Sequence, residues 1–364
     1  MILFVHNRYR QSGGEERAVE NLLWLVREHL GEDAELLTRD SALLGRRQAA
    51  AGMLRGGLAP DEVARAVRRT NARVVHAHNL HPSLGWRALA AARQAGARVV
   101  AHFHQYRSVC AVGICFTQGS ECTRCHGRNT LPGVLHNCRG DAREALVYAA
   151  SLALWQRRAA GLIDAAIVPS EFAHARLRAL GAPLPRSVHV VADPVRAIVA
   201  ASQAARGSYA LLAGRLEPEK GLGVAVAACA QAGVPLVVAG EGSERSLHEG
   251  APGVTFAGSV DAEALAKLRT GARLAVMPSL TAETFGLAAA EALAAGLPVA
   301  ASDIGALREL VPREWLSAPG DAAALAQTVA ALAGDPAAGE TALAAARERL
   351  DPGRIASTLA AIYS

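Results

Sequence analysis

The segment LLAGRLEPEKGLG places two cations five residues apart, Arg215 and Lys220. The lysine stands out, because only two of the 38 basic side chains are lysines, and the other is Lys267. Arginine offers a planar fork for phosphate oxygens, and lysine offers a compact point charge. Together they can hold a diphosphate and stabilise the charge that develops as it leaves. A surface pair that bridges to Glu217 and Glu219 is the simpler alternative, which the rarity of lysine disfavours.

The position of these cations favours the diphosphate interpretation. Arg215 follows the apolar run YALLAG, and open α/β sheets bind ligands at the carboxyl ends of their strands. Gly214 and Gly221 allow the backbone to come close to a ligand, and Pro218 stiffens the turn between them. The segment therefore predicts a phosphate site at the end of a buried strand.

A second segment, residues 279–302, adds an anion-binding helix end and two carboxylates. Its polar turn TAETFG precedes a helix that ends at a glycine with a proline just beyond. Three free N–H groups at the start of such a helix bind phosphate, and here they belong to Phe285, Gly286 and Leu287. Glu283 in the turn can grip sugar hydroxyls, and Glu291 in the helix can take a ribose diol. The alternatives are a partner for the helix dipole and ordinary helix polarity.

The first half of the chain holds two further features. Gly13-Gly14 opens a helix after the first apolar run, which predicts a backbone anion site or a simple tight turn. Two His-x-His pairs lie in VVHAHN and AHFHQYR. Alternate strand residues share a face, so each pair could bind a metal as in metal-dependent hydrolases, although no aspartate is placed to complete either set.

Five cysteines gather within 29 residues, together with His126 and His136. In a reduced compartment a Cys-x2-Cys pair with further thiols favours structural zinc over disulfides. An iron–sulfur cluster and free thiols without metal remain alternatives. The sixth cysteine, Cys229, lies alone in an apolar helix and is expected in the core.

Short continuous apolar runs alternate with helical stretches along the whole chain, which is typical of parallel sheets covered by helices. At 364 residues, two domains are expected. The segment 194–208 has no strand signal and precedes a new series of strands and helices. We therefore predict a first domain over 1–194 with a cysteine-rich loop at 108–140, a second over 195–347, and a final helical segment over 348–364.

The charge is unevenly distributed. Residues 1–165 carry 22 basic and 14 acidic side chains, net +8, and the remainder carries 16 and 19, net −3. A basic first half suits an anionic partner, although scattered surface arginines are the plain alternative. No apolar run reaches the roughly 18 residues that span a bilayer, and the N-terminal burst is too short for a signal peptide. These features predict a cytoplasmic protein.

The C-terminal half resembles the retaining glycosyltransferases of family 4, which have the GT-B fold. The matching motifs are GRLEPEKG, AGEGSE at 239–244, PS at 278–279, the Glu-x7-Glu pair with ETFG, and GLPVAAS. The resemblance implies two Rossmann-like doubly wound parallel-sheet domains facing a central cleft. The final helix would return to the first domain.

The resemblance also implies roles for individual residues. Arg215 and Lys220 would hold the donor diphosphate, Glu283 would contact the transferred sugar, and His104 would lie near that sugar. The implied donor-binding residues are Gly13, Gly14, Gly214, Glu241, Gly242, Thr284, Phe285, Gly286, Leu287 and Glu291. His76 and His102 are then expected to be packed, hydrogen-bonded histidines. Zinc ligands would be Cys110, Cys122, Cys125 and Cys138, because a subgroup of the family resembles this chain in carrying cysteines there.

The resemblance thus implies a glycosyltransferase that takes a sugar from a UDP- or GDP-linked donor, with retention. The acceptor would be a glycan or a lipid-linked molecule, with peripheral contact to an anionic membrane at the inner face and no nucleic acid partner. No organic cofactor and no catalytic metal are expected, and zinc would be structural. A metal-dependent hydrolase, a nucleotide-sugar epimerase and a non-catalytic binding protein are the alternative functions.

Overall fold

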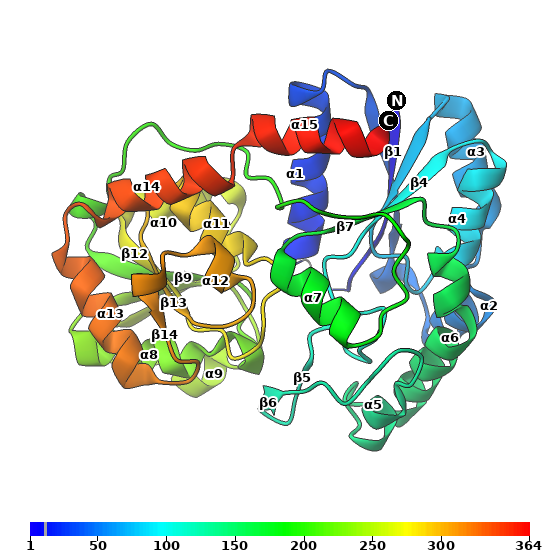
Figure 1. The fold of residues 1–364 in the computed structure, drawn as a ribbon. Helices are drawn as coiled ribbons and strands as arrows, with labels where there is room; N and C mark the ends of the chain where they lie inside the picture. Colours follow the sequence, from blue (N-terminus) through cyan, green and yellow to red (C-terminus); the bar gives the residue numbers. More distant parts are fainter. Residues whose placement is uncertain (11–12) are drawn as a thin grey trace. The chain divides into compact units, whose positions relative to one another are not determined.

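The computed structural model describes residues 1–10 and 13–364 of the chain (Figure 1). The chain divides into two compact units. Unit 1 comprises Met1–Thr117, Cys122–Pro194 and Pro352–Ser364, and unit 2 comprises Gln118–Glu121 and Val195–Asp351. Unit 2 runs to Asp351 rather than to residue 347 because its last helix continues to Arg349.

Unit 1 is built on a parallel sheet with the strand order β2-β1-β3-β4-β7-β8. Its strands are β1 (Ile2–Arg8), β2 (Ala34–Asp40), β3 (Val74–Ala77), β4 (Arg98–His102), β7 (Ala165–Val168) and β8 (Val188–Val190). Its helices are α1 (Gly14–His29), η1 (Ser41–Leu43), α2 (Arg46–Arg55), α3 (Pro60–Thr70), α4 (Gly85–Gln94), α5 (Leu131–Leu135), α6 (Ala142–Ala160), α7 (Glu171–Ala179) and α15 (Pro352–Tyr363). Between β4 and α6 lie the two-residue strands β5 (Phe116–Thr117) and β6 (Ser120–Glu121).

Unit 2 has a second parallel sheet, with the order β11-β10-β9-β12-β13-β14. Its strands are β9 (Tyr209–Ala213), β10 (Leu236–Ala239), β11 (Val254–Gly258), β12 (Ala272–Met277), β13 (Val299–Ser302) and β14 (Leu316–Ser317). Its helices are η2 (Ala204–Arg206), η3 (Pro218–Lys220), α8 (Leu222–Ala232), α9 (Arg245–His248), α10 (Ala262–Gly271), α11 (Leu287–Ala294), α12 (Leu307–Leu310), η4 (Arg313–Trp315), α13 (Ala322–Gly334) and α14 (Ala338–Arg349).

The strands of unit 1 are buried on both faces, which explains their continuous apolar runs. One face packs Phe4 against Leu22 of α1 and Leu359 of α15, and the other packs Leu3 against Val63 and Leu89. Figure 1 shows the C-terminal helix α15 lying beside α1. The last helix is therefore part of the core of unit 1, although it follows unit 2 in the chain.

Each apolar run that the sequence predicts as a strand contains a strand, and Cys229 is buried in α8 as predicted. The sequence misses β5, β6 and β14, because each has only two residues and no apolar run of its own. No helix of the described residues combines the length and the hydropathy needed to cross a bilayer.

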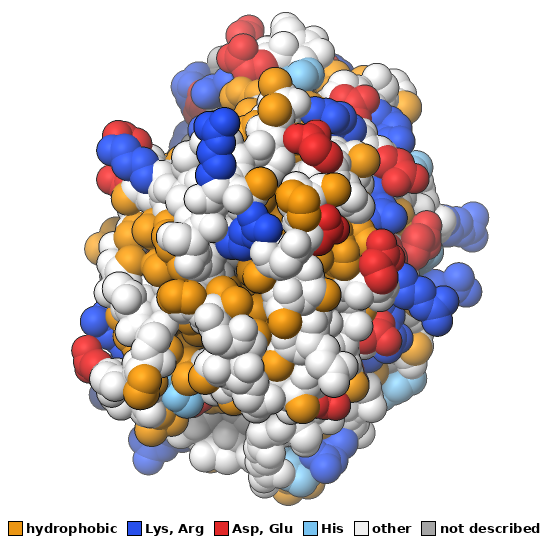
Figure 2. Space-filling view, turned by 90° about the vertical axis from the view of Figure 1, so that its left-hand side faces the viewer, with side chains coloured by type: hydrophobic (Ala, Val, Ile, Leu, Met, Phe, Trp, Pro, Cys, Tyr) orange, Lys and Arg blue, Asp and Glu red, His pale blue; other side chains and the backbone are white. Residues whose placement is uncertain are grey.

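The large exposed apolar side chains are concentrated in unit 1. Figure 2 shows the side of the molecule with α13 and α14, where hydrophobic and uncharged atoms cover much of the middle of the face and charged side chains lie mostly around its edges. Much of this surface comes from alanine-rich helices, and only Val199 and Leu247 are large exposed apolar residues in the described part of unit 2. The other seven, all leucines, belong to unit 1.

Candidate functional site

The candidate donor site lies where the strand order of unit 2 reverses. The first strand, β9, pairs with β10 on one side and with β12 on the other. Loops that leave such neighbouring strands in opposite directions open a crevice at the carboxyl ends, where α/β sheets bind ligands. Arg215 leaves β9 there, and Ser279 and Glu283 follow β12. The topology therefore brings together the two segments that the sequence selected.

Glycines are required where the loops after β9 and β10 cross. A Cβ on Gly240 would lie 1.8 Å from the carbonyl oxygen of Gly214, and one on Gly242 would lie 2.3 Å from that of Leu216. The N–H of Leu216 donates to the carbonyl of Glu241 at 2.9 Å. The AGEGSE motif is thus the backbone support of the loop that carries Arg215.

Lys220 and Glu283 form the centre of this site. The Lys220 Nζ donates to Glu283 Oε1 at 2.6 Å, and Ser279 Oγ donates to the same oxygen at 2.8 Å. Arg215 Nη2 donates to Glu219 at 3.0 Å, and its charge also acts on Glu283. Lys220 therefore contacts this carboxylate directly and Arg215 acts on it through its charge, while the side chain of Arg215 pairs with Glu219, as the surface-pair alternative expects.

Glu283 is ionised in this environment. Burial alone would raise its pKa, but the charge and hydrogen bond of Lys220, the Ser279 hydroxyl and the charge of Arg215 outweigh it and hold the pKa below its usual value. The carboxylate is also fixed through its backbone, because Ala306 donates to the Glu283 carbonyl at 3.0 Å. A fixed anion among cations can orient hydroxyl groups of a sugar and balance the charge of the site.

The start of α11 follows the turn that carries Glu283. Gly286 is its N-cap with φ +91°, and a Cβ there would lie 2.8 Å from Leu307 Cδ2. Phe285 is buried, whereas Thr284 and Leu287 are partly exposed. α11 has eight residues, enough for unsatisfied N–H groups and a positive dipole end at Leu287. The predicted helix N-terminus therefore follows Glu283 directly.

Two predicted donor-binding carboxylates are held by arginines. Glu291 in α11 is ion-paired with Arg269 of α10, and both side chains are nearly buried. Glu241 is half-exposed and ion-paired with Arg245. The sequence analysis does not identify Arg269 as the partner of Glu291, because Arg269 lies 22 residues earlier in the chain, in another helix. A ligand hydroxyl that reaches Glu291 would share that carboxylate with Arg269.

We expect Gly221→Ala to damage this site more than Gly233→Ala. Both glycines lie in the left-handed region, at φ +71° and +66°, so alanine at either position costs about 1–2 kcal/mol in backbone strain. A Cβ on Gly221 would also lie 2.1 Å from the Pro278 carbonyl, whereas Gly233 has no neighbour within 4 Å. Chemical denaturation and nucleotide binding of both variants measure the difference. Equal losses would show that the close approach to Pro278 has no role.

The strand order of unit 1 reverses between β1 and β3, and the predicted glycine pair follows β1 there. Gly13 is the N-cap of α1, but its N–H donates to Glu16 at 2.9 Å. Glu15 is buried beside Glu16, and nothing lies within 4 Å of a Cβ on Gly14. The helix therefore supplies its own carboxylates where the sequence predicts an anion site.

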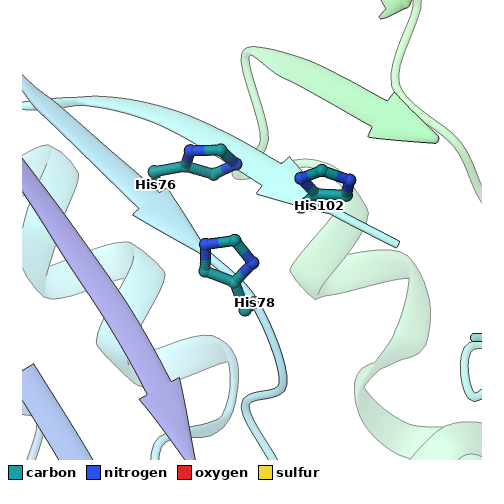
Figure 3. A group of neighbouring side chains, drawn as sticks. All are labelled: His76, His78 and His102. Atoms are coloured by element: carbon teal, nitrogen blue, oxygen red, sulfur yellow. The ribbon is translucent and has the colours of Figure 1, made fainter. Parts of the chain in front are cut away.

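The two His-x-His pairs form one buried cluster. Figure 3 shows His76 of β3 and His78, which directly follows β3, near His102 at the end of β4. The His76 and His102 rings are stacked with centroids 5.5 Å apart, and His76 Nδ1 lies 2.7 Å from the Tyr363 hydroxyl of α15. His76 is therefore packed and hydrogen-bonded, as predicted. His102 is packed, but among the described residues neither of its ring nitrogens has a hydrogen-bond partner, so that half of the prediction is wrong for His102. Burial lowers the pKa of His76 to about 3, and burial with the charges of His104 and His76 lowers the pKa of His102 well below its usual value.

The prediction that no aspartate completes the histidine pairs is wrong. Asp193, 89 residues after His104, lies with Oδ1 3.5 Å from both His102 Nε2 and His104 Nδ1. Sequence analysis did not find Asp193, because it is distant from the histidines in the chain. The available signal was its position just after the apolar run VHVV, since polar residues also follow other strands of the sheet. Burial would lower the pKa of His104, but Asp193 and then Glu15 and Glu16 outweigh it and raise this pKa above its usual value, in contrast to those of His76 and His102.

The imidazole rings of the histidine cluster are arranged as a stack and not as the ligands of a metal ion. The groups His76/His78/His102 and His102/His104/Asp193 have ligand atoms within 4.8 Å of one another. However, the His102 and His104 rings lie 4.0 Å apart at an interplanar angle of only 14°. Imidazole lone pairs lie in the ring plane, so nearly parallel rings do not direct them at one ion. His78 and His104 instead line a cavity of about 140 Å³ in unit 1.

The cysteine-rich loop gathers its thiols around one small space. All five cysteines line a cavity of about 20 Å³: Cys110, Cys115, Cys122, Cys125 and Cys138. The Cys115 thiol donates to the Cys110 sulfur, which also accepts backbone N–H groups of Val112 and Gly113 and has a pKa lowered to about 6. The four predicted zinc ligands thus border the same cavity, with Cys115 as a fifth member.

Comparisons with known proteins agree with this architecture. The model of the family described as glycosyl transferases group 1 matches residues 207–335, within unit 2. A glycogen synthase of Mycobacterium tuberculosis is 38% identical over 172 residues, covering 42% of this chain and 41% of the relative. A phosphatidyl-myo-inositol mannosyltransferase of Mycobacterium leprae is 34% identical over 174 residues, covering 43% and 46%. The matches thus span less than half the length of these curated relatives.

Solved structures match over the whole chain. A sucrose-phosphate synthase from Thermosynechococcus elongatus superposes with a TM-score of 0.69 at 18% identity, covering 100% of this chain and 98% of that one. Anabaena HepE, crystallised with UDP and glucose, superposes with a TM-score of 0.64 at 18% identity, covering 100% and 99%. The chain therefore has the GT-B fold, and residues 207–335 of its second unit match the model of the group 1 glycosyl transferases.

Proposed function

We propose that the protein is a retaining glycosyltransferase that uses a UDP- or GDP-linked sugar donor. The observation that carries this proposal is the gathering of Lys220 and Arg215 around Glu283, directly ahead of the α11 N-terminus. Such an arrangement stabilises a departing diphosphate by fixed charges and dipoles. The relatives named as glycogen synthase and mannosyltransferase, and the UDP in the HepE crystals, support a nucleotide-sugar donor.

In the proposed reaction the bond between the sugar C1 and the diphosphate oxygen breaks. A bond from C1 to an acceptor oxygen forms on the same face, and the acceptor proton passes to the departing diphosphate. Lys220 and Arg215 neutralise the charge that the diphosphate gains. This route needs no carboxylate nucleophile, which suits a site whose Glu283 is already engaged by Lys220 and Ser279.

The remaining residues would position the donor. Glu283 would accept hydrogen bonds from hydroxyls of the transferred sugar, and Glu291, oriented by Arg269, would bind the ribose diol. His104 would interact with the sugar from unit 1 as a cation, since Asp193 favours its protonated form. The acceptor would be a glycan or a lipid-linked molecule bound by unit 1, at the cytoplasmic face of a membrane.

A panel of UDP- and GDP-linked sugars tests this proposal. We expect the wild-type chain to hydrolyse one donor slowly, or to transfer its sugar, and to release the matching nucleoside diphosphate. The product should keep the anomeric configuration of the donor. Product analysis by NMR separates the alternatives: an epimerised donor would indicate an epimerase, and binding without turnover would indicate a binding protein. Inversion at C1 would contradict the proposed mechanism.

A further inference from the structure

Unit 1 contains a second, larger cavity that the proposed donor site does not use. Its volume is about 510 Å³, within the size range of small-molecule sites. Six arginines line it: Arg10, Arg46, Arg47, Arg107, Arg139 and Arg143. The acidic residues of the lining are Asp141 and Glu144. The cavity is therefore strongly basic.

Most of this charge has no counterion. Arg46 lies 3.5 Å from Asp141 and Arg139 lies 3.7 Å from Glu144. Among the described residues, the other four arginines have no carboxylate oxygen within 4.0 Å. Arg107 is half-buried, donates to the Gln105 side chain at 2.8 Å and lies over the Tyr9 ring. Arg107 is the partly buried member of these four, whereas Arg10, Arg47 and Arg143 are exposed to solvent. A partly buried cation attracts an anion more strongly than an exposed one does, because water screens it less.

The cavity also has an apolar side. Ala50, Met53 and Val147 contribute to its lining. Two exposed leucines, Leu43 of η1 (83%) and Leu146 of α6 (59%), are near this lining in sequence but do not line the cavity. Ser41 and Val147, which line the cavity, are close to these leucines in sequence. A ligand with an anionic group and an apolar chain fits this combination.

This arginine-lined cavity, the arginine cavity, adjoins the cavity of about 140 Å³ that His78 and His104 line. Tyr9, Met53, His81 and Arg107 line both. An acceptor whose anionic group lies among the arginines would therefore reach toward His104, the residue proposed to meet the transferred sugar. This continuity ties the basic cavity to the same reaction.

We propose that the arginine cavity binds the phosphate or diphosphate ester of an amphiphilic acceptor. The proposal rests on the proposed function and names its acceptor class. Four arginines of the cavity have no carboxylate of the described residues within 4.0 Å, and their charge suits the two to three negative charges of a diphosphate ester. A ligand with a single carboxylate would neutralise only one of these four charges. Arginine forks bind phosphate oxygens in pairs, and Ala50, Met53 and Val147 would contact the apolar chain.

Binding to the full-length Lys220→Ala chain tests this proposal, because the variant disables the phosphate site of unit 2 and the readout needs no turnover. Titration calorimetry would use four probes: farnesyl diphosphate, inorganic pyrophosphate, farnesol and glucuronate. We expect both diphosphates to bind, and Arg47→Ala and Arg143→Ala to weaken each of them about tenfold. Arg65→Ala, an exposed arginine of α3 outside the cavity, is the matched control.

The probes separate the sources of the anion. Tighter binding of farnesyl diphosphate than of pyrophosphate would assign the cavity to a lipid-linked acceptor, and equal binding would assign it to the phosphate group alone. Farnesol or glucuronate binding as tightly as the diphosphates would overturn the proposal. So would diphosphate binding that Arg47→Ala and Arg143→Ala leave unchanged. Because wild-type turnover is assayed separately, either hypothesis can fail without the other.

A second inference comes from the cysteine-rich loop and is independent of the reaction. We propose that Cys110, Cys122, Cys125 and Cys138 bind one structural zinc ion. They border one apolar cavity of about 20 Å³. The loop around them has little regular structure, with left-handed backbone at Gln118 and Asn137. A bound metal would supply the folding energy that such a loop lacks.

Five thiols border the cavity, one more than a tetrahedral zinc site takes, and Cys115 is the one outside the predicted set. In the described residues no three cysteine sulfurs lie within 4.8 Å of one another, whereas a zinc–sulfur bond of about 2.3 Å needs closer sulfurs. Zinc binding would therefore draw the loop inward.

Metal analysis of the purified, reduced chain tests this site. We expect one zinc per wild-type chain, retained in Cys115→Ser and Cys229→Ser and lost in Cys122→Ser and Cys138→Ser. If the latter variants do not fold, titration of the wild-type chain with a mercurial should release one zinc as four thiols react. A wild-type chain without zinc, iron in its place, or full zinc retention in Cys138→Ser would overturn the assignment.

Discussion

Replacing Lys220 by alanine is expected to lower the rate of sugar transfer by about 10²–10³-fold, the usual cost of removing one group that stabilises developing charge. Lys220 is the group that approaches Glu283 at 2.6 Å, and its ammonium would balance the departing diphosphate. We expect the loss mainly in kcat, because that charge appears only as the bond breaks. Steady-state kinetics with the preferred nucleotide sugar would measure it.

The chain supplies a matched control for this variant. Lys267 is its other lysine, and it forms an exposed pair with Glu263 on α10. Lys267→Ala should keep wild-type kinetics. Lys220→Ala also removes the cation that pairs with the Glu283 carboxylate. A Lys220→Ala/Glu283→Gln double variant separates the cost of that unpaired carboxylate from the loss of the cation itself. A Lys220→Ala chain as active as Lys267→Ala would contradict the mechanism.

Mild acid is expected to unfold unit 1. The pKa values of His76 and His81 are about 3 and 4, because burial lowers them, and burial with neighbouring imidazole charges lowers those of His78 and His102. These imidazoles stay neutral in the folded chain but gain protons below about pH 6.5 when unfolded. Stability therefore falls as the pH falls. Each contributes about 2 kcal/mol between pH 7 and 5, and four together approach the whole stability of a domain.

His104 does not offset this loss. Its pKa is raised, so below pH 6.5 it is protonated in both states and its stabilisation is already fully present. Urea denaturation at pH 7, 6 and 5 would measure the effect. Tryptophan fluorescence in a Trp315→Phe background reports unit 1 alone, since the other three tryptophans lie there. His76→Gln should reduce the pH dependence by about a quarter, whereas exposed His29→Asn should not. Constant stability from pH 7 to 5 would refute the prediction.

The donor segments could be predicted because their chemistry is local in sequence. The loop after β9 and the start of α11 each combine a strand end with glycines and charged groups. Parallel topology then places both at one edge of the sheet. Asp193 and Arg269 could not be found in this way, because each reaches its partner from a distant element and neither belongs to a motif.

The arginine cavity was beyond sequence analysis for a related reason. Its arginines come from the loop after β1, from α2, from the segment after β4 and from α6, so only the fold collects them. The excess of basic residues in the first half indicated an anionic partner but not its location. The glycine pair shows the opposite case, since its local pattern suggested an anion site that Glu16 fills.

Binding of the diphosphate itself is the most direct test of the central claim. Titrations of the wild-type chain with UDP and GDP, and with uridine and guanosine, would measure what the diphosphate contributes to affinity. We predict that one diphosphate binds about 100-fold more tightly than its nucleoside, and that Arg215→Ala and Lys220→Ala each remove most of this difference. Equal binding of diphosphate and nucleoside, or an unchanged difference in both variants, would contradict the account.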